Sequence, residues 1–508
     1  MAILQALCLL GATALAAAST FGADSQAVFS PREHAFSRYD EGMFTPLGDL
    51  SALSSTDFTR LEHPAFPRYA VRVKQSTFCD GKAQAYTGYI DVSDARHLFF
   101  YFFESRRDPD TDDVIFWTNG GPGASSSMGL FMELGPCRVT SANSTEPNPY
   151  SWNEHANVFF VDQPVGVGFS YAEYGESVGT TFEAADDIAA FMAIFFEHFT
   201  KFKGRALHLA GESYGGRYIP VFAATIYDKN AQLVEAGITP INLTSIMIGT
   251  HLLLRSRNGC TDFSTMFTSY YDAQCSDPTF PPVQGISYVC LLRSCMGVPR
   301  CEQRYKESCV DKVDSIDCAA AASFCSTAMS ELFRDLNHYD RARPCKGAAD
   351  ITECYPIMRH IGDFLNSKRT QELLGVDTSV RGNFSWHAPS VGEAFRANLD
   401  HYGFPAQYYI GALLERGIRT LIYVGATDYI CNWIGNERMT LALEWSQQEA
   451  YRSAPLEEWT VEGKAAGVTR SGGGLTYATI AGAGHMAPYD KPVESLELAN
   501  KWLAGVPL

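Results

Sequence analysis

Positive charge is scarce in this chain, and long apolar runs are missing after its first residues. Lysine and arginine number 40 against 57 aspartates and glutamates, which gives a net charge of −17. A chain of this charge is repelled by nucleic acids and anionic membranes, so neither is an expected partner. No later apolar run reaches the roughly 20 residues that cross a bilayer, so we expect no membrane anchor.

Low-complexity tracts, internal repeats and the C-x₂-C pairs of zinc sites are missing as well. What remains is a globular composition with 46% hydrophobic residues, long enough at 508 residues for one large α/β domain with insertions. We therefore expect a protein without a metal ion or a cofactor.

The N-terminal stretch MAILQALCLLGATALAAAS is apolar and ends in small residues, although its apolar core lacks the lysine or arginine that usually precedes it in a signal peptide. This pattern favours a secretory signal peptide at residues 1–18 over a hydrophobic N-terminal helix. Residues 19–68 lack strong periodicity and are expected to be a propeptide or an N-terminal arm. The catalytic domain is then expected over residues 69–508.

Cysteine is plentiful, with 14 in the chain, and most crowd between Cys275 and Cys354. Disulfides formed in an oxidising compartment explain this better than metal ligands. The segment at about 259–356 interrupts the strand–helix pattern, so we expect a cross-linked cap insertion there; a solvated loop is the alternative. Spacing favours the pairs Cys275–Cys295, Cys301–Cys325, Cys309–Cys318 and Cys345–Cys354, and leaves the partners of Cys79, Cys137, Cys260 and Cys290 open.

Three N-x-S/T sequons, at Asn143, Asn242 and Asn383, are compatible with glycosylation. Together with the signal peptide and the cysteines they indicate the secretory pathway, and both secretion and vacuolar delivery stay open.

Short β-branched or aromatic runs alternate with helical patterns along the chain. HLFFYFFES, DVIFWTNG, NVFFVDQP, LTSIMIG, RTLIYVGA and LTYATIAG have the composition of buried strands. Between Thr181 and Phe199, apolar residues repeat at helical spacing. Such alternation predicts an α/β fold, a mostly parallel sheet with helices on both faces.

A Gly-x-Ser-x-Gly pattern centres on Ser213, between a predicted strand and a predicted helix. In this context it predicts a nucleophile elbow, a sharp turn that lifts the serine hydroxyl above the sheet. Two later loops, each directly after a predicted strand, carry Asp428 and His485. Because ligands collect at the carboxyl ends of parallel strands, we expect Ser213 as nucleophile, His485 as its base and Asp428 as the acid that orients the base.

The segment WTNGGPGASS, Trp117 to Ser126, also follows a predicted strand. Its consecutive glycines allow backbone N–H groups to face an oxyanion, with the N–H of Tyr214 as the second donor. A plain turn would explain the glycines and proline, but not Trp117 and Asn119 before them.

Together these segments resemble the serine carboxypeptidases, closest to the fungal carboxypeptidase Y branch. The matching motifs, from about Tyr86 to Leu503, are WTNGGPGASS, GLFMELGP, VDQPVGVGFSY, GESYGGRYIP, GATDYICNWIGN and GAGHMAPYDKP. The resemblance implies an α/β-hydrolase fold and the release of C-terminal amino acids from peptides and proteins at acidic pH through an acyl-enzyme. An acyltransferase or esterase on the same scaffold is the alternative. A binding protein without catalysis is disfavoured by the complete triad.

The resemblance also implies roles for single residues. Gly121 and Tyr214 would supply the oxyanion N–H groups. The substrate's terminal carboxylate would be bound by Trp117, Asn119, Glu133 and Glu212, a set that favours the peptidase over its alternatives. Positions that resemble the substrate pocket are Met128, Met132, Tyr339, Tyr355, Cys431 and Met486, and Cys431 also resembles the branch's free thiol.

Glu212 precedes the expected nucleophile, where an ionised carboxylate would repel an anionic substrate. If Glu133 lies beside it, both carboxyls cannot ionise cheaply, and one keeps its proton. A protonated carboxyl can donate a hydrogen bond to the incoming carboxylate. We therefore expect peptidase activity to fall toward neutral pH.

Three features depart from the family pattern. The branch usually carries cysteines at Ala124 and near Gly382, so one disulfide is expected to be lost as a pair. Thr250–Arg257 looks like an eight-residue insertion, either a real loop or a splice boundary in the gene model. The region before Tyr69 is shorter than the propeptide of the yeast-type vacuolar enzyme, which leaves vacuolar targeting open.

Overall fold

Five of the six apolar runs, together with the strand that ends at Ser213, form the parallel centre of one sheet in a computed structural model of the chain. In order across the sheet these strands are β8 (Asn157–Val161), β5 (Val114–Thr118), β10 (Leu207–Ser213), β11 (Leu243–His251), β12 (Arg419–Gly425) and β15 (Leu475–Ile480). Strands β5, β8 and β15 are buried at every position, because helices cover both faces of the sheet. The prediction of a mostly parallel α/β sheet is confirmed.

The structure describes residues 44–79, 84–251, 300–301, 303–312, 314–329, 337–343, 345, 351–400 and 406–508. The expected signal peptide, the Cys275–Cys295 pair, Cys260 and Cys290 lie outside these residues.

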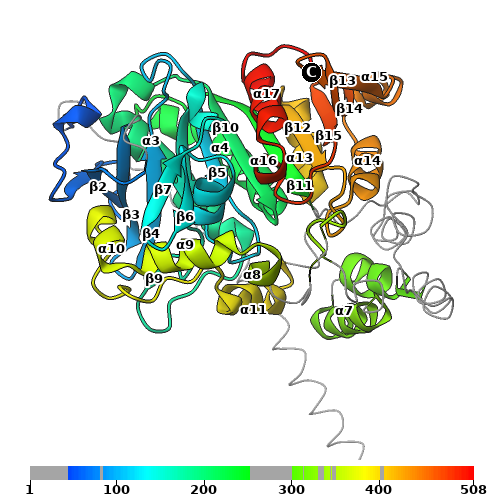
Figure 1. Ribbon diagram of the computed structural model, residues 1–508, viewed down its shortest axis with the longest axis horizontal. Helices are drawn as coiled ribbons and strands as arrows, with labels where there is room; N and C mark the ends of the chain where they lie inside the picture. Colours follow the sequence, from blue (N-terminus) through cyan, green and yellow to red (C-terminus); the bar gives the residue numbers. More distant parts are fainter. Residues whose placement is uncertain are drawn as a thin grey trace, which may run out of the picture. The chain divides into compact units, whose positions relative to one another are not determined.

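Antiparallel strands extend the parallel centre at both edges (Figure 1). On one side these are β4 (Arg96–Phe103), β3 (Ala85–Ser93), β2 (Ala70–Ser76) and β1 (Thr59–Glu62), with the short β9 (Tyr171–Ala172) against β4; on the other, β14 (Lys464–Gly472) and β13 (Glu457–Val461). β1 belongs to the segment expected to be a propeptide or arm, so the end of that segment pairs with the sheet.

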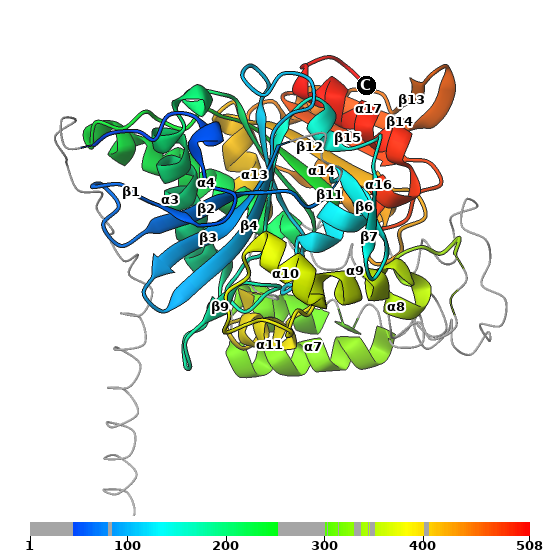
Figure 2. The same ribbon diagram turned by 60° about the vertical axis from the view of Figure 1, so that its left-hand side comes forward.

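Helices cover the two faces of the sheet (Figure 2). On one face α3 (Thr181–His198), α4 (Gly215–Glu235) and α13 (Ala406–Glu415) pack against one another, and on the other lie α16 (Ala487–Asp490) and α17 (Pro492–Leu503). α3 is the helix predicted from the spacing of its apolar residues. Its N-cap residue, Thr180, accepts a hydrogen bond from the N–H of Glu183. The ring centroid of its Phe195 lies 4.8 Å from that of Phe159 on β8.

The remaining elements are short. They are η3 (Leu50–Ala52), η4 (Gly129–Glu133), η5 (Trp152–Glu154), η6 (Thr200–Phe202), α9 (Ile357–Asn366), α10 (Lys368–Leu374), α11 (Pro389–Ala397), α14 (Trp433–Ala442), α15 (Gln448–Arg452) and the separate hairpin β6 (Cys137–Ser141)–β7 (Ser144–Pro147). No helix within the described ranges is long and apolar enough to cross a membrane.

The described part of the cap insertion contains η7 (Lys306–Asp311), α7 (Ser315–Met329) and α8 (Ile351–Cys354). Disulfides join Cys301 to Cys325, Cys309 to Cys318 and Cys345 to Cys354, the pairs that spacing favoured. A further disulfide, Cys79–Cys137, links the segment before β3 to β6 and pairs two cysteines that the sequence left open.

Two of the departures from the family pattern fall on described residues. Near Ala124, where the resemblance implies a lost disulfide, backbone hydrogen bonds join two segments: Ser125 N donates to Trp386 O at 2.9 Å and Ala388 N to Gly123 O at 2.8 Å. The expected insertion begins within β11, which runs through Thr250 to His251, and residues 252–257 lie outside the described chain.

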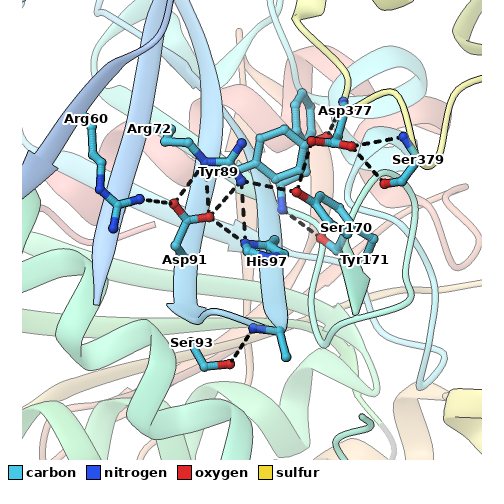
Figure 3. A network of polar contacts seen from close by, with 12 residues as sticks. Arg60, Arg72, Tyr89, Asp91, Ser93, His97, Ser170, Tyr171, Asp377 and Ser379 are labelled. Carbon is cyan, nitrogen blue, oxygen red and sulfur yellow. Dashed lines mark hydrogen bonds and ion pairs between the residues drawn. The ribbon is translucent and has the colours of Figure 1, made fainter. Parts of the chain in front are cut away.

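A buried carboxylate cross-links the strands at the β1 edge of the sheet (Figure 3). Asp91 on β3 accepts from Arg72 Nη2 at 2.7 Å and from Arg60 Nη1 at 3.2 Å, and its Oδ1 lies 2.6 Å from His97 Nδ1. These charges tie β1, β2 and β4 to β3. In the sheet order, β8 and β5 separate this network from β10, which ends at Ser213, and from β12 and β15, whose following loops carry Asp428 and His485.

Candidate active site

Ser213 ends β10 and lies two residues before α4, in the turn that the Gly-x-Ser-x-Gly pattern predicts. Its φ of 58° is in the left-handed region, a conformation that non-glycine residues rarely adopt. The glycines on either side, Gly211 and Gly215, let this turn pack closely against α4 and against the end of β5. A Cβ on Gly211 would lie 2.8 Å from Ile219 Cγ1, and one on Gly215 would lie 3.1 Å from Thr118 O. The half-buried serine is thus presented at the carboxyl end of β10.

Asp428 and His485 come from the loops after β12 and β15, two neighbouring parallel strands. His485 Nδ1 lies 2.8 Å from Asp428 Oδ2, and both residues are buried. When Nδ1 carries the proton toward the carboxylate, Nε2 is the nitrogen that can accept a proton from a nucleophile. The pair therefore has the geometry of a base and the acid that orients it.

Cys431 lies beside this pair. Asp428, Cys431 and His485 each place a side-chain atom within 4.8 Å of the others. Both Asp428 oxygens already accept hydrogen bonds, since Oδ1 takes the N–H of Cys431 at 3.1 Å and Oδ2 faces the imidazole. We therefore interpret this cluster as an acid–histidine pair with a neighbouring thiol rather than as a metal site. The thiol is the one free cysteine of the described chain, and burial raises its pKa well above the ordinary value.

The glycine turn after β5 lies directly against the elbow. A Cβ on Gly120 would lie 2.2 Å from Tyr214 N, so only glycine permits this approach. Gly121 follows with a φ of 108°, again a glycine conformation. Tyr214 N stands at the start of α4, where the helix dipole favours negative charge. The turn and the elbow thus bring the two segments that carry the expected oxyanion donors, the backbone N–H groups of Gly121 and Tyr214, into contact.

Asn119 joins the four residues expected to bind a terminal carboxylate. Its Oδ1 accepts from Trp117 Nε1 at 2.9 Å, which orients the amide. Its Nδ2 then points to two carboxyl groups, Glu133 Oε1 and Glu212 Oε1, at 3.4 Å each. All four side chains are buried. The structure therefore brings together Glu133 from η4 and Glu212 from β10, as the chemistry of a shared proton requires.

Burial is the main cause that raises the pKa of Glu212 well above the ordinary carboxyl value. The charge of Glu133 and a hydrogen bond with it raise this pKa further, and Asp428 adds to the effect. Burial also raises the pKa of Glu133, while its hydrogen bonds with Glu212 and Asn119 oppose that rise. The pair therefore keeps a proton at a pH where isolated carboxyls are ionised.

Five of the six expected pocket positions belong to the main hydrophobic core or pack against it. Met128, Met132, Tyr355 and Met486 belong to one buried cluster, and the partly exposed Tyr339 packs against it. The Tyr339 ring lies 5.2 Å from the His485 ring and 6.4 Å from that of Tyr355. The expected glycosylation residues, Asn143, Asn242 and Asn383, are all exposed.

Sequence reasoning missed two buried acids that hold this site together. Asp162 accepts from Ser125 Oγ at 2.6 Å and from Ser126 N at 3.0 Å, which fixes the loop after the glycine turn. Its burial raises the pKa to about 6. Asp400 accepts from the hydroxyl of Tyr214 at 2.8 Å. The motif VDQPVGVGFSY contained Asp162, but nothing in it revealed which loop the carboxylate would meet.

An organomercurial that reacts with the thiol of Cys431 is expected to lower the catalytic activity. Mercury on this sulfur would occupy the space beside Asp428 and His485, since their side-chain atoms lie within 4.8 Å. The reaction should be slow at neutral pH because burial disfavours the reactive thiolate. Titration of activity with p-hydroxymercuribenzoate measures the effect, and Cys431→Ser should be resistant. Equal inhibition of Cys431→Ser would show that mercury acts elsewhere.

Comparison with known proteins gives two kinds of match. Residues 77–505 match the model of the serine carboxypeptidase family. Carboxypeptidase Y of Komagataella phaffii is 36% identical over 457 residues, which cover 88% of this chain and 81% of the relative. Carboxypeptidase Y homolog A of Pyrenophora tritici-repentis is 38% identical over 447 residues, covering 86% and 77%.

Among solved structures, the fold is similar to that of a prohormone-processing carboxypeptidase, KEX1(delta)p of Saccharomyces cerevisiae. The TM-score is 0.69 at 21% sequence identity, with 89% of this chain and 96% of the other covered. At this identity the likeness establishes the α/β-hydrolase fold, while the family match rests on the sequence comparisons.

Proposed function

The chain belongs to the serine carboxypeptidase family, and on this premise we propose that it releases C-terminal amino acids from peptides and proteins at acidic pH. The proposed reaction passes through an acyl-enzyme on Ser213, with His485 as base and Asp428 as its orienting acid. The observation that carries the proposal is the buried Asn119–Glu133–Glu212 cluster next to the nucleophile.

In the first step Ser213 Oγ would attack the carbonyl carbon of the last peptide bond while its proton passes to His485 Nε2. The N–H groups of Gly121 and Tyr214 would stabilise the oxyanion. His485 would then return the proton to the leaving nitrogen, and the C-terminal amino acid would depart. A water molecule activated by the same imidazole would hydrolyse the ester and restore Ser213.

The carboxyl cluster would decide which bond is cut. Glu212 directly precedes Ser213 in the chain. A substrate whose terminal carboxylate is bound by Glu212 would therefore have its last peptide bond near the nucleophile. Asn119 Nδ2 and a protonated carboxyl of the pair would donate to it. An esterase or acyltransferase has no need of such a cluster.

We also propose a location in the secretory pathway, with secretion and vacuolar delivery as the two outcomes. The disulfides of the described residues support an oxidising compartment. Exposure of Asn143, Asn242 and Asn383 leaves all three sequons accessible to glycosylation.

A blocked dipeptide tests the proposed function directly. Incubation at acidic pH should release the C-terminal amino acid, measured by amine labelling, while the same dipeptide with a C-terminal amide should react more weakly. A folded wild-type protein that releases no amino acid at any acidic pH would refute the proposal. Release of an alcohol from esters without release from any peptide would favour the esterase.

A further inference from the structure

One segment of the cap region joins the two loops that carry Asp428 and His485. We call residues 337–343 the strap. Its backbone makes three hydrogen bonds to those loops: Ile430 N donates to His338 O at 2.9 Å, Arg341 N to Thr427 O at 3.1 Å, and His485 N to Tyr339 O at 2.6 Å. The expected base and its acid are therefore both tied to one stretch of cap backbone.

Asp340 is the buried side chain in the middle of the strap, 5% exposed. Its Oδ1 accepts from Ala342 N at 2.9 Å and from Thr427 Oγ1 at 2.6 Å, a hydroxyl that also lies 2.8 Å from Ala483 O. Thr427 directly precedes Asp428. The Asp340 carboxylate is thus bonded one residue away from the acid of the expected triad.

The same side chain packs against the loop of His485. A Cβ on Gly484, the residue before His485, would lie 2.5 Å from both Asp340 Cβ and Tyr339 O. This contact needs a glycine, because any side chain would push the strap and the histidine loop apart.

Arg343 completes the connection from the strap to the histidine loop. Its Nε lies 3.6 Å from Asp340 Oδ2, and its Nη2 lies 2.6 Å from Asp490 Oδ1. Asp490 Oδ2 in turn accepts from Gly484 N at 2.9 Å. The guanidinium carbon lies over two aromatic rings, 4.9 Å from the ring centroid of Tyr355 and 5.4 Å from that of Tyr489.

We propose that Asp340 is a positioning residue for the catalytic triad, which fixes the loop of Asp428 against the loop of His485. This inference rests on the proposed function and deepens it, since it makes a part of the cap necessary for chemistry. The two loops also touch directly, through Thr427 N and Ala483 O at 2.8 Å. Loss of Asp340 should therefore loosen the triad rather than dismantle it. A misplacement of about 1 Å costs on the order of 100-fold in rate.

The test compares Asp340→Ala and Asp340→Asn with Asp91→Ala as a matched control. Asp91 is also a buried carboxylate that links several elements, but it lies at the β1 edge of the sheet (Figure 3). Two rates are measured per folded molecule: phosphonylation of Ser213 by a fluorophosphonate, followed by intact mass, and kcat for an ester substrate, together with its KM.

Asp340→Ala should lower both rates about 10- to 100-fold and leave KM within about twofold. Asp340→Asn keeps an acceptor for Thr427 Oγ1 and should recover most of the loss. Asp91→Ala should keep wild-type rates, even if its melting temperature falls. If Asp340→Ala does not fold, Asp340→Leu replaces it in the test, because leucine has the same branching as aspartate but offers no acceptor to Thr427 Oγ1 or Ala342 N; a loss of about tenfold is expected.

Wild-type rates in folded Asp340→Ala or Asp340→Leu would overturn the proposal. So would an equal loss in Asp91→Ala, or a raised KM with unchanged kcat. The fluorophosphonate separates this proposal from the peptidase assignment. If wild-type Ser213 reacts with the probe but no peptide is cleaved, the proposed function fails, and the probe rates of the variants still decide the role of Asp340.

Discussion

Ser213→Ala is expected to lower kcat for a blocked dipeptide about a millionfold, the loss typical when the nucleophile of a serine triad is removed. The base and its acid stay in place, but no acyl-enzyme can form without the hydroxyl. Residual hydrolysis would come only from the oxyanion donors and substrate binding. Amino acid release followed by mass spectrometry measures the loss.

The same substitution should leave the melting temperature within about 2 °C of wild type. Alanine at position 213 has the same left-handed backbone to adopt as serine, so the strain of the elbow does not change. Ser495→Ala is the matched control. Ser495 is a buried serine on α17 whose hydroxyl has no hydrogen-bond partner among the described residues, so its loss should leave kcat unaltered. Normal activity of Ser213→Ala would remove Ser213 from the mechanism.

A rise in pH should raise KM for a blocked dipeptide acid about tenfold per pH unit above the pKa of the Glu133–Glu212 pair. The sign follows from the raised pKa values. Below that pKa the pair holds a proton and can donate to the substrate's carboxylate, and above it two negative charges repel that carboxylate. The corresponding amide lacks the charge, so its KM should change little over the same range.

Glu212→Gln sharpens this experiment. The amide of glutamine still offers a donor but cannot ionise, so KM for the acid substrate should lose this part of its pH dependence. Asn119→Ala removes the donor that contacts both carboxyls and should raise KM for the acid about 10- to 100-fold at every pH. Identical pH profiles for the acid and the amide would contradict the role proposed for the pair.

Local patterns in the sequence predicted the fold and the positions of Ser213, Asp428 and His485 along the chain. Apolar runs such as DVIFWTNG became the buried strands of the parallel sheet, because a strand covered on both faces is mostly apolar on both. The glycines around Ser213 predicted the elbow, since a left-handed serine needs small neighbours. Asp428 and His485 were identified by their place after strands, and their side chains meet at 2.8 Å.

The contacts between distant segments could not be read from the sequence. Spacing within the cap favoured the three disulfides that its described part contains, but Cys79–Cys137 spans 58 residues and had no local signal. Asp162 was part of a quoted motif, yet its partners Ser125 and Ser126 lie on another loop. The residues before Tyr69 looked irregular, although β1 pairs with the sheet edge.

By itself, then, the sequence determined the sheet, the elbow and the identity of the chemical groups, because these depend on periodicity and on neighbours within a few residues. Only the tertiary structure decided how Glu133 and Glu212 meet at the buried amide of Asn119, and that Asp340 contacts the loops of both Asp428 and His485. Such approaches depend on how separate strands and loops pack. The pKa of a carboxyl changes with that packing, through burial and nearby charge, which no stretch of sequence encodes alone.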